Sequence, residues 1–255
     1  MASIDKELYG LVGFPLGHSF SRSFFIKKFE EDGIDAEYRN FEIPTITAFK
    51  DVIRSNPALR GLNVTIPYKQ AVIPYLDELD PVAARVGAVN VVRIDRGADG
   101  IVRLKGFNSD IIGFVGSISP LLAGGSHTKA LVLGTGGASR AVMAGLESLG
   151  ITGTLVSRTM RSGVATYAAL DAAMMASHTV VVNTTPLGMY PHVDACPDIP
   201  YDMLTENHVC YDLVYNPEVT LFMQRSAANG ATVKNGLEML RLQALASWEM
   251  WHGND

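Results

Sequence analysis

The chain has 255 residues, of which 47% are hydrophobic and 18% charged, and its 21 basic and 26 acidic side chains give a net charge of -5. This composition describes a globular protein with a substantial core and excludes an intrinsically disordered chain. The negative charge gives no electrostatic reason to bind nucleic acid or an anionic membrane, so an anionic ligand needs a local positive site. The length suits two modest domains.

The N-terminal segment and the cysteines indicate an intracellular protein. MASIDKELYGLVG has no basic region followed by a long apolar run, and no stretch is apolar for long enough to cross a bilayer. We therefore expect a soluble, cytoplasmic protein with no membrane partner. Cys196 and Cys210 are expected to be free thiols, as is usual in a reducing compartment.

The first part of the chain alternates strand-like and helical stretches, which predicts an α/β layer with mostly parallel strands. The expected strands and helices alternate over residues 9–14, 21–33, 36–43, 45–56, 61–67 and 69–79. Two extended runs, 88–95 and 102–108, are bridged by glycines and aspartates and predict a hairpin. Because this hairpin interrupts the α/β rhythm, it marks a domain edge.

A second series of strands and helices follows a connecting helix predicted over residues 110–125. It begins with a strand, a glycine-rich turn and a helix over 129–150, and further strands are expected over 152–158, 179–185 and 208–215. A helix over 236–253 closes the chain. Its apolar residues form one stripe at helical spacing, made of Leu237, Leu240, Ala244, Trp248 and Trp251.

The turn in LVLGTGGASRA places Gly134, Gly136 and Gly137 directly between a strand and a helix, which is the context of a dinucleotide-binding turn. Glycines permit the tight turn and let backbone N–H groups approach a pyrophosphate at the start of the helix. Ser139 stands where the third glycine or alanine of G-x-G-x-x-G is expected. A turn that needs glycines only for its backbone is the alternative interpretation.

The end of the next strand indicates which dinucleotide the turn would bind. An NAD site usually has an acidic residue there to bind the ribose 2′-hydroxyl, whereas this strand runs into Ser157, Arg158, Thr159 and Arg161. Guanidinium groups are suitable donors to a 2′-phosphate. The sequence therefore favours NADP over NAD.

The stretch GLNVTIPYK raises the question of a functional lysine. Strand alternation predicts Asn63 and Thr65 on one face and Val64 and Ile66 on the core face. The polar face then lies at the carboxyl end of a strand, where open α/β sheets bind ligands. Lys69 is predicted to begin the next helix, where the helix dipole disfavours a cation, although a single lysine is usually a surface charge.

A similar polar pattern recurs further along the chain. Asn90 lies in GAVNVV, and Asn108, Ser109 and Asp110 precede a predicted helix in GFNSDIIG. On helix chemistry alone, Asp110 is an N-cap residue.

Taken together, these segments resemble the shikimate dehydrogenase family along nearly the full chain. The segments that carry the resemblance, in shared order and spacing, are GFPLGHSFSRS (13–23), NVTIPYK (63–69), VGAVNVV (86–92), GFNSDIIGF (106–114), LGTGGASRA (133–141), VSRTMR (156–161), VNTTPLGMYP (182–191), YDLVYNP (211–217) and NGLEMLRLQA (235–244). The resemblance implies an α/β protein with a substrate-binding and catalytic domain over 1–109 and a Rossmann-like NADP-binding domain over 110–235. A C-terminal helix over 236–255 is expected to pack back on the substrate domain.

The activity that the resemblance implies is the NADPH-dependent, reversible reduction of 3-dehydroshikimate to shikimate in chorismate and aromatic amino-acid biosynthesis. Lys69 and Asp110 would be the catalytic pair. The residues implied to bind the small-molecule substrate are Ser19, Ser21, Asn63, Thr65, Asn90, Tyr215 and Gln243. Those implied to bind NADP are Gly134, Thr135, Gly136, Gly137, Ala138, Ser139, Ser157, Arg158, Thr159, Arg161, Leu213 and Gly236.

The chain departs from the family pattern at three positions and leaves two alternatives open. Arg22 replaces the proline after H-S-x-S, Ser157 replaces an asparagine before the arginine, and Ser109 replaces the threonine of N-T-D. The alternatives are a paralogue that also oxidises quinate or uses NAD, and a non-catalytic NADP-binding regulator. We expect a monomer or homodimer, and no metal site, because His192 and Cys196 are only two possible ligands in a loop.

Overall fold

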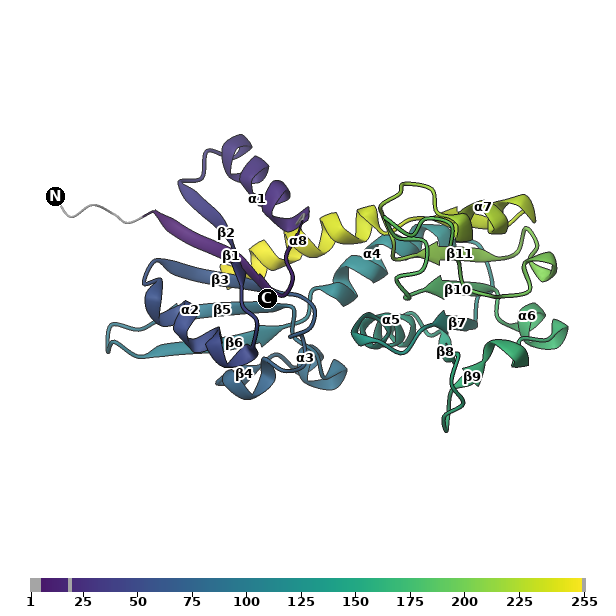
Figure 1. Cartoon of the computed structure of the whole chain (residues 1–255), viewed down its shortest axis with the longest axis horizontal. Coiled ribbons are helices and arrows are strands. Elements are labelled where there is room, and N and C mark those ends of the chain that lie inside the picture. The colour runs from purple at the N-terminus through teal and green to yellow at the C-terminus, as the bar shows by residue number, and fades with distance from the viewer. Residues whose placement is uncertain (1–5, 18–19, 254–255) are drawn as a thin grey trace. The chain divides into compact units, whose positions relative to one another are not determined.

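The structure, a computed structural model, describes residues 6–17 and 20–253. The chain divides into two compact units, each with its own sheet (Figure 1). The first unit combines Met1–Ser109 with Gln243–Asp255, and the second is Asp110–Leu242. The last segment of the first unit therefore starts at Gln243, whereas the sequence placed the start of this segment at residue 236.

The sheet of the first unit has six strands in the order β2-β1-β3-β5-β6-β4. Its strands are β1 (Glu7–Gly13), β2 (Ala36–Glu42), β3 (Leu59–Val64), β4 (Glu78–Leu79), β5 (Val91–Arg96) and β6 (Val102–Phe107). Strand β1 pairs in parallel with β2 and β3, whereas β5 pairs antiparallel with β3 and β6. The predicted hairpin is confirmed by the β5–β6 pair.

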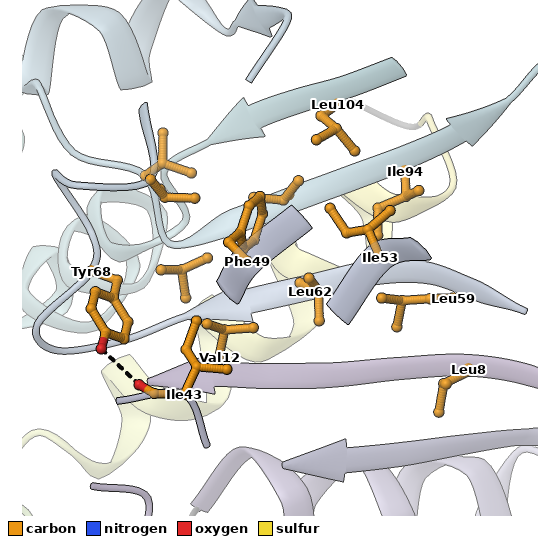
Figure 2. Close-up of a cluster of buried hydrophobic side chains, with 14 of the residues drawn as sticks. Leu8, Val12, Ile43, Phe49, Ile53, Leu59, Leu62, Tyr68, Ile94 and Leu104 are labelled. Carbon is orange, nitrogen blue, oxygen red and sulfur yellow. Dashed lines mark hydrogen bonds between the residues drawn. The ribbon is translucent and has the colours of Figure 1, made fainter. Parts of the chain in front are cut away.

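Helices cover both faces of this sheet, because alternate residues of the strands point to opposite sides. Leu8 and Val12 of β1 join a cluster with α2 (Phe49–Ser55) and α3 (Pro81–Val86), part of which Figure 2 shows. Tyr9 of β1 joins the other cluster, with α1 (Phe20–Glu31) and the later part of α8 (Leu237–Trp251).

Two expectations about the chain after β3 are wrong. Residues 69–79 form no long helix; they form turns, a short 3-10 helix at Ile73–Tyr75 and the edge strand β4. Pro74 lacks the N–H that an α-helix would use, and Asp77 N donates instead to Leu104 O of β6 at 2.9 Å. Ile66 is 74% exposed rather than buried, because strand alternation ends with β3 at Val64.

The sheet of the second unit has six parallel strands in the order β12-β11-β10-β7-β8-β9. They are β7 (Lys129–Leu133), β8 (Thr152–Ser157), β9 (Ala165–Thr166), β10 (Val180–Asn183), β11 (Val209–Asp212) and β12 (Thr232–Lys234). The order of the first three strands is reversed relative to the last three, which is the Rossmann topology, and the reversal lies between β7 and β10.

The parallel strands are apolar on both faces because helices cover both. One face packs on α4 (Asp110–Leu122) and α5 (Gly137–Ser148), and the other on α6 (Ala172–Ser177) and α7 (Leu221–Ala228). In α8, Leu237 is 45% exposed, so the predicted apolar stripe lacks its first residue. Over the described ranges, no helix is long and apolar enough to span a membrane.

Candidate active site

A buried polar network in the first unit is built around Asn63, which lies near the carboxyl end of β3. The Tyr38 hydroxyl donates to Asn63 Oδ1 at 2.8 Å, and Asn63 Nδ2 donates to Ser247 Oγ at 3.0 Å. Asn63 is 8% exposed and Tyr38 2% exposed, so each polar atom needs its partner. The predicted amide is therefore present at the strand end in one fixed orientation.

Asn90 extends this network on the neighbouring segment. Its Oδ1 accepts the backbone N–H of Ser109 at 2.7 Å, and its Nδ2 donates to Ser109 Oγ at 3.0 Å and to Gln243 Oε1 at 3.4 Å. The hydroxyl groups of Ser109 and Ser247 lie 3.2 Å apart, which joins the two asparagines through serines. The structure thus brings together Asn63, Asn90 and Gln243, three of the residues that the resemblance implies.

Ser21 joins the network at Tyr38. Burial raises the pKa of Tyr38 well above its ordinary value, and a hydrogen bond with the Ser21 side chain opposes this rise only in part. Tyr38 is therefore a neutral phenol that donates to Asn63 at all ordinary pH values. Ser19, predicted to act beside Ser21, lies outside the described residues.

Removing the Tyr38 hydroxyl should destabilise this network. Tyr38→Phe leaves the buried Asn63 Oδ1 without its donor, so we expect the free energy of unfolding to fall by about 1–3 kcal/mol. Urea denaturation measures this change. Tyr75→Phe is the matched control, since within the described structure the Tyr75 hydroxyl has no hydrogen-bond partner; equal losses in the two variants would contradict the assigned bond.

Lys69 lies in a turn that is fixed on both sides. The Tyr68 side chain is 5% exposed, and its hydroxyl donates to Ile43 O at 2.7 Å (Figure 2). The carbonyl oxygen of Lys69 accepts the N–H of Val89 at 2.7 Å, one residue before Asn90. The half-buried Lys69 is thus presented from a rigid turn, and not from the helix start that the sequence predicted.

Thr65 lies in the first unit, and Asp110 is the first residue of the second unit. The N–H of Thr65 donates to Val12 O at 2.9 Å, so the residue follows β3 beside the end of β1. Asp110 follows Ser109 along the chain, is 4% exposed and is the first residue of α4, where a carboxylate is stabilised by the helix dipole. Tyr215 lies in the second unit, shortly after β11.

The glycine-rich turn of the second unit lies at the strand reversal between β7 and β10. Gly134 has a φ of +108°, and a Cβ there would lie 2.9 Å from Thr184 Oγ1, so only glycine fits between the two strand ends. Thr184 N donates to Leu133 O at 2.9 Å, which holds the strand ends together. Helix α5 begins at Gly137, with Gly136 as its N-cap, so its free N–H groups face an approaching anion.

A pocket of about 670 Å³ opens beside this turn. Of the predicted cofactor residues, its lining contains Gly134, Thr135, Gly136, Ser157 and Arg158. Arg158 is exposed, so its guanidinium is available to a ligand. The positive charge of Arg158 acts on Tyr167, another lining residue, and there it opposes the increase in the pKa of Tyr167 that burial causes.

Several other residues of this unit that are predicted to bind the cofactor do not line the pocket. As far as the described residues show, Gly137, Ala138, Ser139, Thr159 and Arg161 are not part of the pocket lining. The Ser139 hydroxyl donates to Gly136 O at 2.7 Å, which stabilises the turn itself.

Leu213 and Gly236, both predicted to contact the nicotinamide end of the cofactor, lie against each other. A Cβ at Gly236 would overlap the carbonyl oxygen of Leu213, and Gly236 N donates to Val214 O at 3.2 Å. A side chain at position 236 would therefore push these two segments apart.

Asp212, at the end of β11, is a fully buried carboxyl group that the sequence analysis did not single out. Burial raises its pKa to about 6, although hydrogen bonds from Thr220, Val214 N and Asn183 oppose the rise. A buried carboxylate is costly unless donors surround it. Asp212 is thus mostly ionised at neutral pH, and it becomes protonated as the pH falls through about 6.

This pKa predicts a measurable pH dependence of stability. Because the pKa in the folded protein lies above the ordinary value of 3.8, the folded state binds more protons than the unfolded chain between about pH 4 and pH 6. The free energy of unfolding should therefore fall by about 3 kcal/mol as the pH rises through this window. Asp212→Asn should lack this decrease in urea denaturation between pH 4 and pH 7, and a variant with the wild-type slope would refute the assignment.

Sequence reasoning missed Tyr38, Ser247 and Asp212. Ser247 had a usable signal, because it lies at helical spacing from Ala244 and Trp251 and so interrupts the apolar stripe of α8 with a hydroxyl. Asp212 had another, a carboxylate at the end of an apolar strand. Among the described residues, no group of three or more His, Cys, Asp or Glu side chains could hold a metal ion.

The chain is similar to known proteins over nearly its whole length. A family model described as the shikimate dehydrogenase substrate binding domain matches residues 11–92. A shikimate dehydrogenase (NADP(+)) from Desulforamulus reducens is 35% identical over 269 residues, which cover 97% of this chain and 90% of the relative.

Solved structures give the same result. Shikimate 5-dehydrogenase from Thermus thermophilus, in complex with NADP(H) and shikimate, superposes with a TM-score of 0.83 at 30% identity and covers 97% of this chain and 94% of that one. Quinate dehydrogenase from Corynebacterium glutamicum, in complex with NAD, superposes with a TM-score of 0.85 at 27% identity, with 97% and 94% covered.

Proposed function

The chain belongs to the shikimate dehydrogenase family, and we propose on this premise that it catalyses the reversible, NADPH-dependent reduction of 3-dehydroshikimate to shikimate. This reaction is a step of chorismate and aromatic amino-acid biosynthesis. The observation that carries the proposal is the pocket in which the glycine-rich turn and Arg158 lie together. It combines a pyrophosphate-binding turn with a cation suited to a 2′-phosphate.

The residues of the second unit fit NADP by their shape and charge. Gly134 permits the close turn against Thr184 and Thr185, the space beside Gly136 and Gly137 is open, and the start of α5 offers backbone N–H groups. We assign the 2′-phosphate to Arg158 with Ser157 and Thr159, and a secondary contact to Arg161. The remaining proposed contacts are Thr135, Gly136, Gly137, Ala138 and Ser139 along the turn and Leu213 and Gly236 at the nicotinamide end.

The substrate is proposed to bind the polar strand ends of the first unit. The serine hydroxyls of Ser19 and Ser21 would bind its carboxylate. The amides and hydroxyls proposed to bind its ring hydroxyl groups are Asn63, Thr65, Asn90, Tyr215 and Gln243. Support comes from the buried network, which fixes the orientation of the two asparagine side chains before any ligand arrives.

Lys69 and Asp110 are the proposed catalytic pair. NADPH, held by the residues proposed above, would supply the hydride that reduces the ring carbonyl of the substrate. The Lys69 ammonium stabilises the negative charge that develops on the carbonyl oxygen and donates a proton to that oxygen. Asp110 orients the Lys69 amine and exchanges its proton. The rigid turn that presents Lys69 supports this role, since a general acid must be held in place.

A dehydrogenase that also oxidises quinate is the second candidate, because the chain superposes on a quinate dehydrogenase as well. A spectrophotometric assay with shikimate and quinate, each with NADP and with NAD, separates the two. We expect the shikimate and NADP combination to have the highest kcat/KM. Absence of dehydrogenation with every combination would favour the non-catalytic NADP-binding regulator.

The proposed setting is cytoplasmic, with a small-molecule substrate as the partner. We expect no nucleic-acid partner, since the net charge is -5. A monomer or a homodimer is the expected assembly, which sedimentation analysis would distinguish.

A further inference from the structure

The Asp212 carboxylate ties three separate segments of the second unit together. Its Oδ1 accepts Asn183 Nδ2 at 2.9 Å and Val214 N at 3.0 Å, and its Oδ2 accepts the Thr220 hydroxyl at 2.6 Å. These partners come from the end of β10, the loop after β11 and the residue that caps α7. One buried side chain thus binds the end of β10, the loop after β11 and the start of α7.

The segment that follows β10 forms a wall of the pocket beside the glycine-rich turn. Asn183 Oδ1 accepts both the N–H of Thr185 at 3.0 Å and its hydroxyl at 2.7 Å. Thr184 and Thr185 line the pocket, and both lie against Gly134, as a Cβ at Gly134 would be 2.9 Å from Thr184 Oγ1 and 3.1 Å from Thr185 Cγ2. The position of Asn183 therefore sets the position of this wall.

The loop after β11 leads to the contact between Leu213 and Gly236. Val214 donates its N–H to Asp212 and accepts Gly236 N through its carbonyl at 3.2 Å. Both bonds are made by Val214, so they fix the chain directly after Leu213. Asp212 therefore acts on Thr184 and Thr185 through Asn183, and on the contact between Leu213 and Gly236 through Val214.

The Asp212 site suits a group that accepts hydrogen bonds. The Asn183 amide and the Val214 N–H, which both meet Oδ1, can only donate there, and the Thr220 hydroxyl, which accepts Met223 N at 3.3 Å, donates to Oδ2. An amide at this position would keep the two bonds to its oxygen but would lose the charge and reverse the direction of the bond with Thr220. A buried charge of this kind often contributes little to stability compared with an uncharged replacement, which favours a role in positioning.

We propose that Asp212 is a positioning residue, which fixes the Thr184–Thr185 wall and the Leu213–Gly236 contact in the arrangement that binds NADP. This inference rests on the proposed NADP-dependent function. It assigns Asp212 no contact with substrate or cofactor. Its effect should therefore appear in cofactor affinity and leave shikimate affinity unchanged.

The test is a fluorescence titration of NADPH, together with steady-state kinetics, on Asp212→Asn. We expect the Kd for NADPH to rise about tenfold, the scale of a hydrogen bond to a charged group. The KM for shikimate should change by less than about twofold, because most of the proposed substrate groups lie in the first unit. An unchanged Kd for NADPH would overturn the positioning role.

Thr220 provides a second pair of variants that keeps the carboxylate and the pocket lining. Thr220→Val removes one donor and should raise the Kd for NADPH about threefold, while Thr220→Ser retains the hydroxyl and should match the wild type. A lower melting temperature of Thr220→Val with an unchanged Kd would mean that the network is only structural. Failure of the wild type to bind NADPH would instead overturn the proposed function itself.

Discussion

Lys69→Ala is expected to lower kcat for shikimate oxidation by about 10²–10⁴-fold, the range of a lost general acid or base. The affinity for NADP should stay within about twofold of the wild type, because the proposed cofactor residues lie elsewhere in the chain. The turn should keep its shape, since Tyr68 and the Lys69 carbonyl hold it through bonds that the substitution leaves intact. Assays of NADPH formation measure kcat, and a separate NADPH titration measures the cofactor affinity.

Two control variants separate proton transfer from charge at this position. Lys69→Arg keeps a cation but cannot release its proton near neutral pH, so its kcat should remain low as well. Lys27→Ala removes an exposed lysine of α1 that pairs with Glu31 at 3.5 Å, and it should be fully active. Near-normal turnover by Lys69→Ala would mean that Lys69 is a surface charge with no catalytic role.

Arg158→Ala is expected to raise the KM for NADPH by about 10–100-fold, since a charge-assisted contact to a 2′-phosphate would be lost. NADH has no 2′-phosphate, so kcat/KM with NADH should change by less than about twofold. The measurement is the ratio of kcat/KM with NADPH to kcat/KM with NADH. This ratio should fall by nearly the same factor as kcat/KM with NADPH.

The internal control for this experiment lies in the same loop. Arg161 is exposed and, among the described residues, is not in the pocket lining, so Arg161→Ala should have a smaller effect than Arg158→Ala. Equal losses with NADPH and NADH in Arg158→Ala would mean that the arginine supports the loop and does not recognise the phosphate.

Local patterns in the sequence were sufficient for most of the fold. Strand alternation, the glycine-rich turn and the run of glycines and aspartates each specify structure within a few neighbouring residues. Residues 69–79 show where this reasoning fails. Their apolar spacing suits a helix, but Leu104 of β6 exchanges hydrogen bonds with Asp77, through the Asp77 N–H and side chain, and this distant pairing takes the segment to the sheet edge.

The candidate site divides in the same way between local and distant information. Arg158 could be predicted because it follows the glycine-rich turn at a characteristic interval. The partners of Asn63 could not, since Tyr38 is 25 positions away and Ser247 is 184 positions away. A polar residue in an apolar pattern tells where a hydrogen bond is needed, but only the folded chain supplies its partner.

The division of the chain into units has a consequence for protein synthesis. The second unit is one continuous segment and can fold as soon as it leaves the ribosome, whereas the first unit is completed by residues that are translated after the whole of the second. Trp251 packs directly on Gly61 of β3, where a Cβ would overlap the indole ring. A nascent chain therefore carries an earliest sheet with one face covered by α1 alone until α8 has been translated, and the exposed remainder of this face is where chaperones are expected to bind.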